Sequence, residues 1–315
     1  MALGCDTTLV IVTDDPPEQV GAIFNLLWLT IFQFERKFSR FIPASELSMF
    51  NRNAGIKTPV SNDFKELLLS AKKMAELTDG LFNPFVLPSL QRAGYMQSSI
   101  AKYSLDESLN VSTRQAAPIQ MLEIIDDSAT IPANTALDMG GIGKGYLADK
   151  LAKMSELSSA QGFWFSLGGD VVAKGLDVDG KPWQISIQDA SRPSDILAIK
   201  MAAKQSITSV ASSGTIIRKG VNNNMPWHHI IDTRTGEPAQ TDILLATVKA
   251  QSACLSDVLA KCAVILGSEE APLFLTNNNI SSYVLQVRQP DDDVNVTMHG
   301  AISSSAAKRL QGVHA

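Results

Sequence analysis

Apolar residues recur with two different spacings along this chain and predict where its strands and helices lie. Residues 7–13 are β-branched and apolar, which is typical of a strand. Residues 21–34 are almost continuously apolar and predict a deeply buried helix that continues to about Phe38, either within one subunit or at a contact between two. This stretch of about 14 residues is shorter than the roughly 20 that a membrane-spanning helix needs.

Polar and turn-forming residues separate the next elements. Residues 39–55 show no period and predict irregular structure. Asn62 is a suitable cap for a second helix, whose apolar residues keep helical spacing up to the Asp79-Gly80 turn. Residues 119–125 and 129–131 predict a hairpin, and residues 146–157 predict a third helix.

The second half of the chain is rich in strand patterns. Residues 162–172 predict two strands separated by Gly168-Gly169, and Ser252 can cap a helix that ends at Gly267. Further strands are predicted at 183–188, 196–201, 206–211, 229–232, 244–250 and 282–288. Strands in runs with single helices between them favour an α+β fold with largely antiparallel or mixed sheets. No linker is evident, so residues 1–315 are expected to form a single domain.

Composition narrows the class of protein. Hydrophobic residues make up 45% and charged residues 19% of the 315, enough apolar side chains for a substantial core. The net charge is −5 and no basic stripe appears, which argues against nucleic-acid binding. Three cysteines do not make a disulfide framework, and Cys254 and Cys262 lie on an apolar helix pattern that predicts buried free thiols.

The first residues predict the cellular compartment. Residues 1–8 have neither the charged start nor the apolar stretch of a secretory signal. As it stands, the sequence predicts a cytoplasmic protein, and a periplasmic one if a signal has been trimmed from it.

A glycine-rich segment, Asp-Met-Gly-Gly-Ile-Gly-Lys-Gly at 138–145, precedes the third predicted helix. Glycines let a ligand approach the backbone, and the start of a helix favours an anion, so the segment indicates a phosphorylated ligand. Lys144 adds a cation. The spacing matches neither the P-loop nor the dinucleotide-binding pattern, and a tight turn without a ligand is the alternative.

This segment is one of seven motifs that follow one another in order. They are Phe-Ser-Arg-Phe at 38–41 with Ser-Glu-Leu-Ser at 45–48 and Asn51; Thr-Asp-Gly-Leu-Phe-Asn-Pro at 78–84; 138–145 with Asp149; Leu-Gly-Gly-Asp at 167–170; Ser-Ser-Gly at 212–214; His-Ile-Ile-Asp-Thr-Arg-Thr-Gly-Glu-Pro at 229–238; and Asp257 with Gly267. From about residue 3 to 267, this series resembles the ApbE-like family, the FAD:protein FMN transferases.

The resemblance implies a compact, T-fold-like α+β protein with FAD in a cleft between two halves. Members use Mg²⁺ at the FAD pyrophosphate and move FMN onto a Thr or Ser hydroxyl of an acceptor protein, with release of AMP. The acceptor is expected to be a subunit of a redox or electron-transport complex. Phosphoryl-group transfer depends mainly on positioning and charge neutralisation, which suits a glycine cradle, a cation and a base.

The resemblance also assigns residues to the site. For FAD it implies Leu3, Leu81, Phe82, Asn83, Asp138, Lys144 and Ile231. For Mg²⁺ it implies the carbonyl of Gly141 and the carboxylate of Asp257, oxygen ligands of the kind this ion prefers. His229 and Asp257 are the candidate catalytic residues, and a histidine, with an ordinary pKa of about 6.5, suits proton transfer at neutral pH.

Among the departures from the family pattern, two concern residues assigned to the site. Asn83 stands where Asp is usual, and Lys261 stands at the metal position where Thr is usual. Residues four apart on a helix share a face, so an ion pair between Asp257 and Lys261 is expected. A protonated ammonium cannot ligate a metal, so Lys261 either competes with Mg²⁺ or takes the place of its charge and holds the pyrophosphate directly.

Two other functions stay open on the sequence. A family member with little or no transferase activity would act as a flavin carrier or an FAD hydrolase, and Lys261 is the residue that favours it. An unrelated binding protein carrying these motifs by chance is disfavoured by their fixed order.

Overall fold

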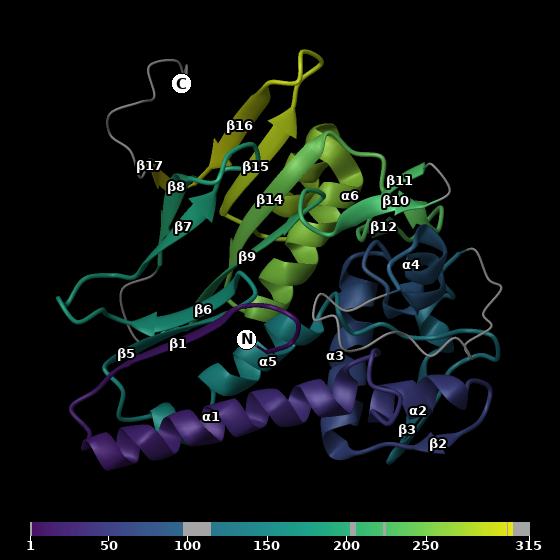
Figure 1. Ribbon diagram of the computed structural model, residues 1–315, viewed down its shortest axis with the longest axis horizontal. Coiled ribbons are helices and arrows are strands. Elements are labelled where there is room, and N and C mark those ends of the chain that lie inside the picture. The colour runs from purple at the N-terminus through teal and green to yellow at the C-terminus, as the bar shows by residue number, and fades with distance from the viewer. Residues whose placement is uncertain (1, 97–114, 202–205, 223–224, 301, 305–315) are drawn as a thin grey trace.

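A seven-stranded antiparallel sheet forms the centre of the protein, with strand order β1-β5-β6-β9-β14-β15-β16 (Figure 1). The computed structural model describes residues 2–96, 115–201, 206–222, 225–300 and 302–304. The strands of this sheet are β1 Thr7–Val12, β5 Gly162–Leu167, β6 Asp170–Gly175, β9 Thr208–Gly214, β14 Ile243–Ala250, β15 Ser282–Arg288 and β16 Val294–His299.

Helices cover one face of this sheet and build a second lobe beside it. Figure 1 shows α5 and α6 behind the sheet, α1 running below them, and α2, α3 and α4 gathered on one side. Their bounds are α1 Pro17–Phe38, α2 Glu46–Arg52, α3 Asn62–Leu77, α4 Leu87–Ala93, α5 Gly143–Ala152 and α6 Ala253–Asn277, with short 3₁₀ turns at Pro84–Val86, Ile119–Met121 and Ser155–Leu157.

Four small sheets complete the described part of the chain. β2 (Thr58–Pro59), β4 (Ser128–Thr130) and β3 (Glu123–Ile125) lie in the helical lobe, and β17 (Ile302–Ser304), β8 (Asp195–Lys200) and β7 (Gln184–Gln188) lie over the large sheet. β10 (Lys219–Asn222) pairs with β11 (Met225–His228), and β12 (Ile231–Asp232) pairs with β13 (Glu237–Pro238). This arrangement confirms the predicted α+β fold with mainly antiparallel pairing.

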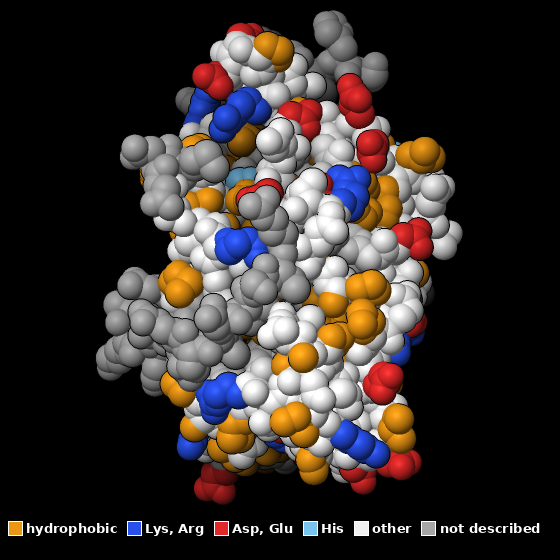
Figure 2. Space-filling model, turned by 90° about the vertical axis from the view of Figure 1, so that its right-hand side faces the viewer, with side chains coloured by type: hydrophobic (Ala, Val, Ile, Leu, Met, Phe, Trp, Pro, Cys, Tyr) orange, Lys and Arg blue, Asp and Glu red, His pale blue; other side chains and the backbone are white. Residues whose placement is uncertain are grey.

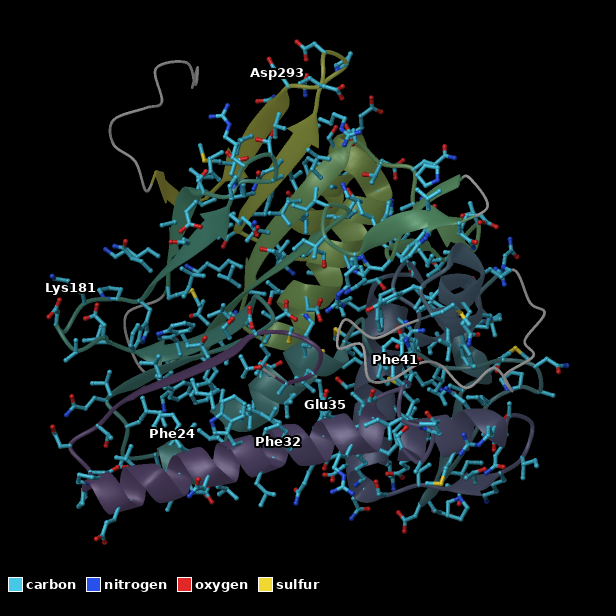
Figure 3. All side chains as sticks on the ribbon, in the orientation of Figure 1. Phe24, Phe32, Glu35, Phe41, Lys181 and Asp293 are labelled. Carbon is cyan, nitrogen blue, oxygen red and sulfur yellow. The ribbon has the colours of Figure 1, made fainter. Side chains whose placement is uncertain are left out.

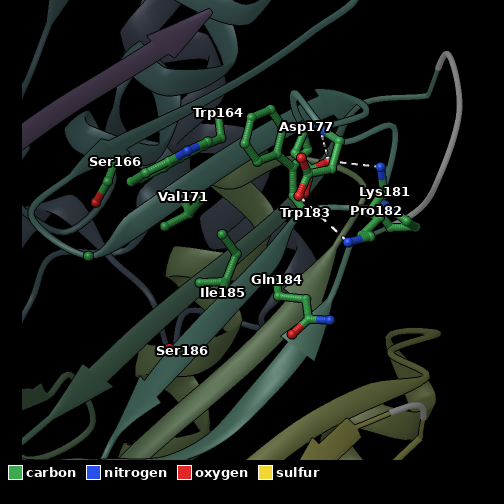
Figure 4. Close-up of a pocket in the computed structure, with 12 residues that line it drawn as sticks. Trp164, Ser166, Val171, Asp177, Lys181, Pro182, Trp183, Gln184, Ile185 and Ser186 are labelled. Carbon is green, nitrogen blue, oxygen red and sulfur yellow. Dashed lines mark hydrogen bonds and ion pairs between the residues drawn. The ribbon is translucent and has the colours of Figure 1, made fainter. Parts of the chain in front are cut away.

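The large sheet is packed on both faces. Along β5, Phe163 and Phe165 belong to the core beneath α1 and α5, because alternate side chains of a strand point to opposite faces. Trp164 points the other way and packs with Ile187 of β7. A cavity of about 760 Å³ lies on this second face, between Trp164 and Trp183 (Figure 4).

Several predicted elements are confirmed, with small shifts. α3 ends before Asp79 and Gly80, which both have positive φ, but its cap is Ser61, whose hydroxyl accepts a hydrogen bond from Phe64 N. Gly168 and Gly169 have φ of +65° and +93° and form the two-residue turn between β5 and β6. Such turns need positive φ at both positions, which glycine adopts without strain.

The helix predicted at residues 21–34 is confirmed, but within this single chain it is not deeply buried; burial at a contact between two subunits stays a prediction. α1 is a helix, but only one stripe of it, Ile23, Leu27 and Ile31, is buried, while Leu29 and Phe32 are about half exposed, at 52% and 46%. Figure 3 shows Phe24 and Phe32 on this helix at the border of the molecule. None of the described helices is both long and apolar enough to cross a membrane.

Three other expectations are corrected. Residues 39–55 contain α2, because Ser45 caps a short helix that buries Leu47 and Phe50. The helix predicted to end at Gly267 breaks there, with φ of +78°, and then continues to Asn277. His229 lies outside the large sheet, between β11 and β12.

Charges on the face shown in Figure 2 are mixed. Acidic and basic side chains are interspersed there, without a continuous basic surface among the residues drawn in colour.

Candidate functional site

The glycine-rich turn is fixed against two other segments. Asp138 N donates to Pro84 O at 2.8 Å, and the Asp138 carboxylate accepts from Gly140 N at 3.1 Å. A Cβ on Gly145 would lie 2.5 Å from Ala253 O, closer than real Cβ atoms come, so α5 can pack against the start of α6 only with glycine here. The glycines of this segment therefore have different roles, and the role of Gly145 is to let α5 pack against α6.

Asp149 locks the same helix pair. Its carboxylate accepts hydrogen bonds from the backbone N–H groups of Ala253 at 2.7 Å and Cys254 at 2.9 Å, and from the hydroxyl of Ser252. These donors are the free N–H groups at the first turn of α6, which a carboxylate satisfies well. The pair of helices holds the turn at Gly141 beside the side chains of α6.

Lys261 on α6 connects these two segments. Its ammonium donates to Gly141 O at 2.9 Å and to Asp257 Oδ1 at 3.0 Å, which confirms the expected pairing of residues four apart. The Lys261 and Asp257 side chains are only 17% and 4% exposed. Among the described residues, Asp257 Oδ2 is buried and has no hydrogen-bond partner. The pair is thus a buried one, in which removal of either partner leaves an uncompensated charge.

The two residues assigned to Mg²⁺, Gly141 and Asp257, lie close together, but both contact the ammonium of Lys261. Gly141 O and Asp257 Oδ1 both accept from Lys261 Nζ. Mg²⁺ takes six oxygen ligands at about 2.0–2.1 Å, and an ammonium at the meeting point supplies none. No group of three or more His, Cys, Asp or Glu side chains suited to a metal occurs in the described ranges. The arrangement at Gly141, Asp257 and Lys261 therefore does not fit a magnesium ion.

A second buried ion pair lies beside the first. Lys144 on α5 pairs with Asp170, which is fully buried at the start of β6. Burial and the Asp257 carboxylate raise the pKa of Asp170 to about 6, although Lys144 lowers it. Burial would lower the pKa of Lys144, but Asp170 and Asp257 raise it above its ordinary value. Both groups are therefore ionised at neutral pH.

Asp170 belongs to the Leu-Gly-Gly-Asp motif at 167–170, but the sequence assigned it no part in the site. The available signal was its position, because a carboxylate followed by Val171 and Val172 in a buried strand requires a partner. The structure identifies this partner as Lys144, so the Lys144 ammonium is held in an ion pair. The sequence alone did not indicate which residue would pair with Asp170.

His229 is held as a neutral imidazole. Its Nδ1 lies 3.3 Å from Arg218 O, and because a carbonyl only accepts, Nδ1 carries the proton and Nε2 keeps its lone pair. Burial, with the charges of Arg218 and Lys261, lowers the pKa of His229 to about 3. The ring contacts Tyr95 edge-on, with centroids 6.2 Å apart. In this state the side chain can accept a proton at Nε2.

Arg40 is a site residue that sequence reasoning left unassigned. Its guanidinium packs on the rings of both Phe41 and Tyr95, at 4.5 and 4.7 Å from their centroids, and these two rings contact each other edge-on. Its Nε is 3.6 Å from Asp138 Oδ1. Arg40 thus connects the glycine-rich turn to Tyr95 and so to His229. Only its place in the 38–41 motif pointed to it.

The residues assigned to FAD lie on several segments. Phe82 is buried beside Gly141, where its ring would lie 3.3 Å from an added Cβ. Asn83 accepts from Phe85 N and donates to Ala117 O, so its side chain serves the backbone as a cap. It also lines a cavity of about 340 Å³. Leu81 adjoins Phe82 and is half-buried.

Leu3 and Ile231, the other two residues assigned to FAD, lie on separate segments. Leu3 sits in a turn closed by a hydrogen bond from Cys5 N to Ala2 O at 3.0 Å. Cys5 lies against Gly168, which in turn lies close to the Lys144 stem. Ile231 is buried and pairs with Pro238 in the β12–β13 hairpin.

Hydrogen bonds tie that hairpin to the helical lobe. Thr233 Oγ1 donates to Gly80 O at 2.7 Å, and Arg92 Nη2 donates to Gly236 O at 3.3 Å. Within the hairpin, the Asp232 carboxylate pairs with the exposed Arg234 guanidinium at 2.9 Å. The segment that follows His229 is therefore anchored next to Phe82 and Asn83.

Comparisons with known proteins agree with this arrangement. A protein from Haemophilus influenzae named FAD:protein FMN transferase is 28% identical over 314 residues, covering 97% of this chain and 86% of its own. One of the same name from Klebsiella pneumoniae is 25% identical over 253 residues, covering 76% and 70%.

Solved structures share the fold. The apbe protein of Thermotoga maritima superposes with a TM-score of 0.79 at 23% identity, covering 94% of each chain. The apo flavinyl transferase ApbE of Pseudomonas stutzeri gives a TM-score of 0.76 at 22% identity, covering 95% of this chain and 92% of its own. The ApbE family model matches residues 3–284. The chain therefore belongs to the ApbE family.

Proposed function

We propose that this protein is an FAD:protein FMN transferase, which moves FMN from FAD to a Thr or Ser hydroxyl of an acceptor protein and releases AMP. Membership of the ApbE family and the names of the relatives support the reaction class. The observation that carries the proposal is the convergence, at one glycine-rich turn, of Gly141, Lys261 and Asp257 from segments far apart in sequence.

The reaction is a displacement at phosphorus. The acceptor hydroxyl oxygen forms a bond to the phosphorus on the FMN side of the pyrophosphate, and the bond from that phosphorus to the bridging oxygen breaks. AMP leaves with the bridging oxygen and its electron pair. The hydroxyl proton goes to Nε2 of His229, whose lone pair is free because Nδ1–H is held toward Arg218 O.

The side chains around the turn supply positioning and charge. Lys144 and Lys261 place two ammonium groups near the pyrophosphate that the turn would hold, and Asp170 and Asp257 fix their positions. Phe82, beside Gly141, offers an apolar surface for the flavin. Transfer of a phosphoryl group needs little more than this positioning and electrostatic stabilisation.

Intact-mass analysis tests the proposal. The purified protein is incubated with FAD and a panel of flavin-acceptor domains, in parallel with Mg²⁺ and with EDTA. A mass gain equal to FMN less water on one acceptor is expected, and it should disappear when the acceptor Thr or Ser is changed to Ala. Conversion of FAD to FMN and AMP without modification of any acceptor would instead identify an FAD hydrolase, and FAD binding without turnover a flavin carrier.

A further inference from the structure

The ammonium of Lys261 occupies the point between a carbonyl and a carboxylate where a cation would be bound. Gly141 O and Asp257 Oδ1 can only accept hydrogen bonds, so Lys261 Nζ donates to both, at 2.9 and 3.0 Å. The stem of the side chain also packs on the turn, with its Cε 3.4 Å from the position of an added Cβ on Gly141. The cation is therefore fixed by contacts along its length.

One N–H donor of the Lys261 ammonium is left over after its two contacts with Gly141 and Asp257. An ammonium carries three N–H donors, and two are used within the protein. The third has no partner in the hydrogen bonds found among the described residues. A phosphate oxygen at the glycine-rich turn would complete the set, in the charge-assisted geometry that lysine uses for phosphates.

The charges around the turn favour a dianion without a metal. The cations near the turn are Lys144, Lys261, Arg218 and Arg40, and the carboxylates are Asp170, Asp257 and Asp138. With His229 neutral, this set has a net charge of +1. A divalent ion added beside Lys261 would face several nearby cations, whereas the pyrophosphate of FAD brings two negative charges.

We infer that Lys261 is a covalently tethered replacement for the divalent cation, so that this protein binds FAD, and transfers FMN, without Mg²⁺. The inference rests on the proposed function for its substrate, since FAD supplies the pyrophosphate. Gly141 and Asp257 hold the ammonium, and the ammonium donates to a pyrophosphate oxygen. Asp257 is then a positioning residue for Lys261 and not a metal ligand.

Binding measurements separate a tethered cation from a metal site. FAD affinity is measured by flavin fluorescence in EDTA and in Mg²⁺ for the wild type, Lys261→Thr and Lys261→Met. The control Lys65→Thr removes a surface lysine that pairs with Asp127. The wild type should bind FAD with the same affinity in EDTA as in Mg²⁺, and so should the control.

The two variants at Lys261 should behave differently from each other. In EDTA, Lys261→Thr should bind FAD about tenfold more weakly or worse, the loss expected for one charge-assisted hydrogen bond. Mg²⁺ should restore its affinity, because Thr supplies a hydroxyl oxygen beside Gly141 O and Asp257. Lys261→Met, which has no donor and no oxygen ligand, should stay weak in both buffers.

Bound Mn²⁺ gives a second measurement that does not depend on turnover. Electron paramagnetic resonance should detect Mn²⁺ bound by Lys261→Thr with FAD and none bound by the wild type with FAD. An FAD affinity of the wild type that falls tenfold in EDTA, or Mn²⁺ bound as tightly by the wild type as by Lys261→Thr, would overturn the inference. The wild-type measurements decide the matter even if a variant fails to fold.

The inference and the proposed function fail in different ways. Acceptor modification by the wild type that requires Mg²⁺ would remove the inference and keep the function. Metal-independent FAD binding without modification of any acceptor would keep Lys261 as the tethered cation for FAD binding, and would remove the transferase together with the metal-independent transfer.

Discussion

Gly145 of α5 and Ala253 of α6 lie so close that a Cβ on the glycine would meet the alanine carbonyl oxygen at 2.5 Å. This contact brings α6 to the glycine-rich turn, and Asp149 holds it there through the backbone of Ala253. The position of Lys261 against Gly141 thus depends on Gly145, which takes no part in the hydrogen bonds of Lys261 to Gly141 and Asp257. The glycine-rich segment serves helix packing in addition to the ligand binding that we propose for it.

Gly145→Ala should therefore destabilise the protein. Alanine is favoured over glycine in a helix by up to about 1 kcal/mol, but forcing a methyl group into a filled space costs about 1–3 kcal/mol. Urea denaturation should show a lower free energy of unfolding. Gly21→Ala on α1 is the control, because nothing lies within 4 Å of its added Cβ, and its stability should be unchanged or higher. Equal effects at the two positions would contradict the close packing.

Asp170→Asn should lower the free energy of unfolding more than an Asp→Asn change at the surface does. It leaves the ammonium of Lys144 buried without a carboxylate, at a cost of about 3 kcal/mol or more. The comparison is Asp63→Asn, since Asp63 pairs with Lys37 and Lys150 but its side chain is 49% exposed. Loss of that surface group should cost about 1 kcal/mol or less. Denaturation midpoints of the two variants check the ranking.

His229 should make stability depend on acid pH. Its pKa is about 3 in the folded protein and about 6.5 in the unfolded chain, so between these values only the unfolded state gains the proton. The contribution is present above pH 6.5 and is lost on acidification toward pH 3, by about 1.4 kcal/mol per unit. His229→Gln should remove this slope. Free energies of unfolding for both proteins between pH 4 and about 7.5 measure the difference, and parallel curves would show that the wild-type histidine titrates normally.

The cysteines should differ in reactivity. Burial raises the pKa of Cys254 and of Cys262 to about 12, so neither forms the reactive thiolate at neutral pH. Burial raises the pKa of Cys5 as well, so its expected reactivity rests on its exposure, because Cys5 is partly exposed while the other two are buried. A thiol reagent should label Cys5 alone in the native protein and all three cysteines in urea. Native labelling of Cys254 would show that the start of α6 opens.

The sequence predicted those features that repeat at short range. The helical spacing in α3 and the apolar runs of β14 and β15 reflect burial of a regular face, and periodicity detects it. α2 was missed because seven residues with two buried apolar side chains are too few to show a period. The exposure of α1 was missed because a continuous apolar run does not indicate which stripe meets the core.

The candidate site was predictable as a set of residues but not as a set of contacts. The motifs named Lys144, Asp257 and His229, and the helical spacing of four predicted the pairing of Asp257 with Lys261. The pairing of Lys144 with Asp170 and the stacking of Arg40 on Tyr95 join residues 26 and 55 positions apart. Such contacts are set by how the sheet and helices pack, which local patterns do not encode.

The hydrogen bonds from Thr233 to Gly80 and from Arg92 to Gly236 have a consequence for the way in which FAD enters. A hinge between the helical lobe and the β12–β13 hairpin would have to break both at once. Domain closure about this point is therefore disfavoured, and adjustment to the flavin should come from side-chain rotation instead of movement between the lobe and the hairpin.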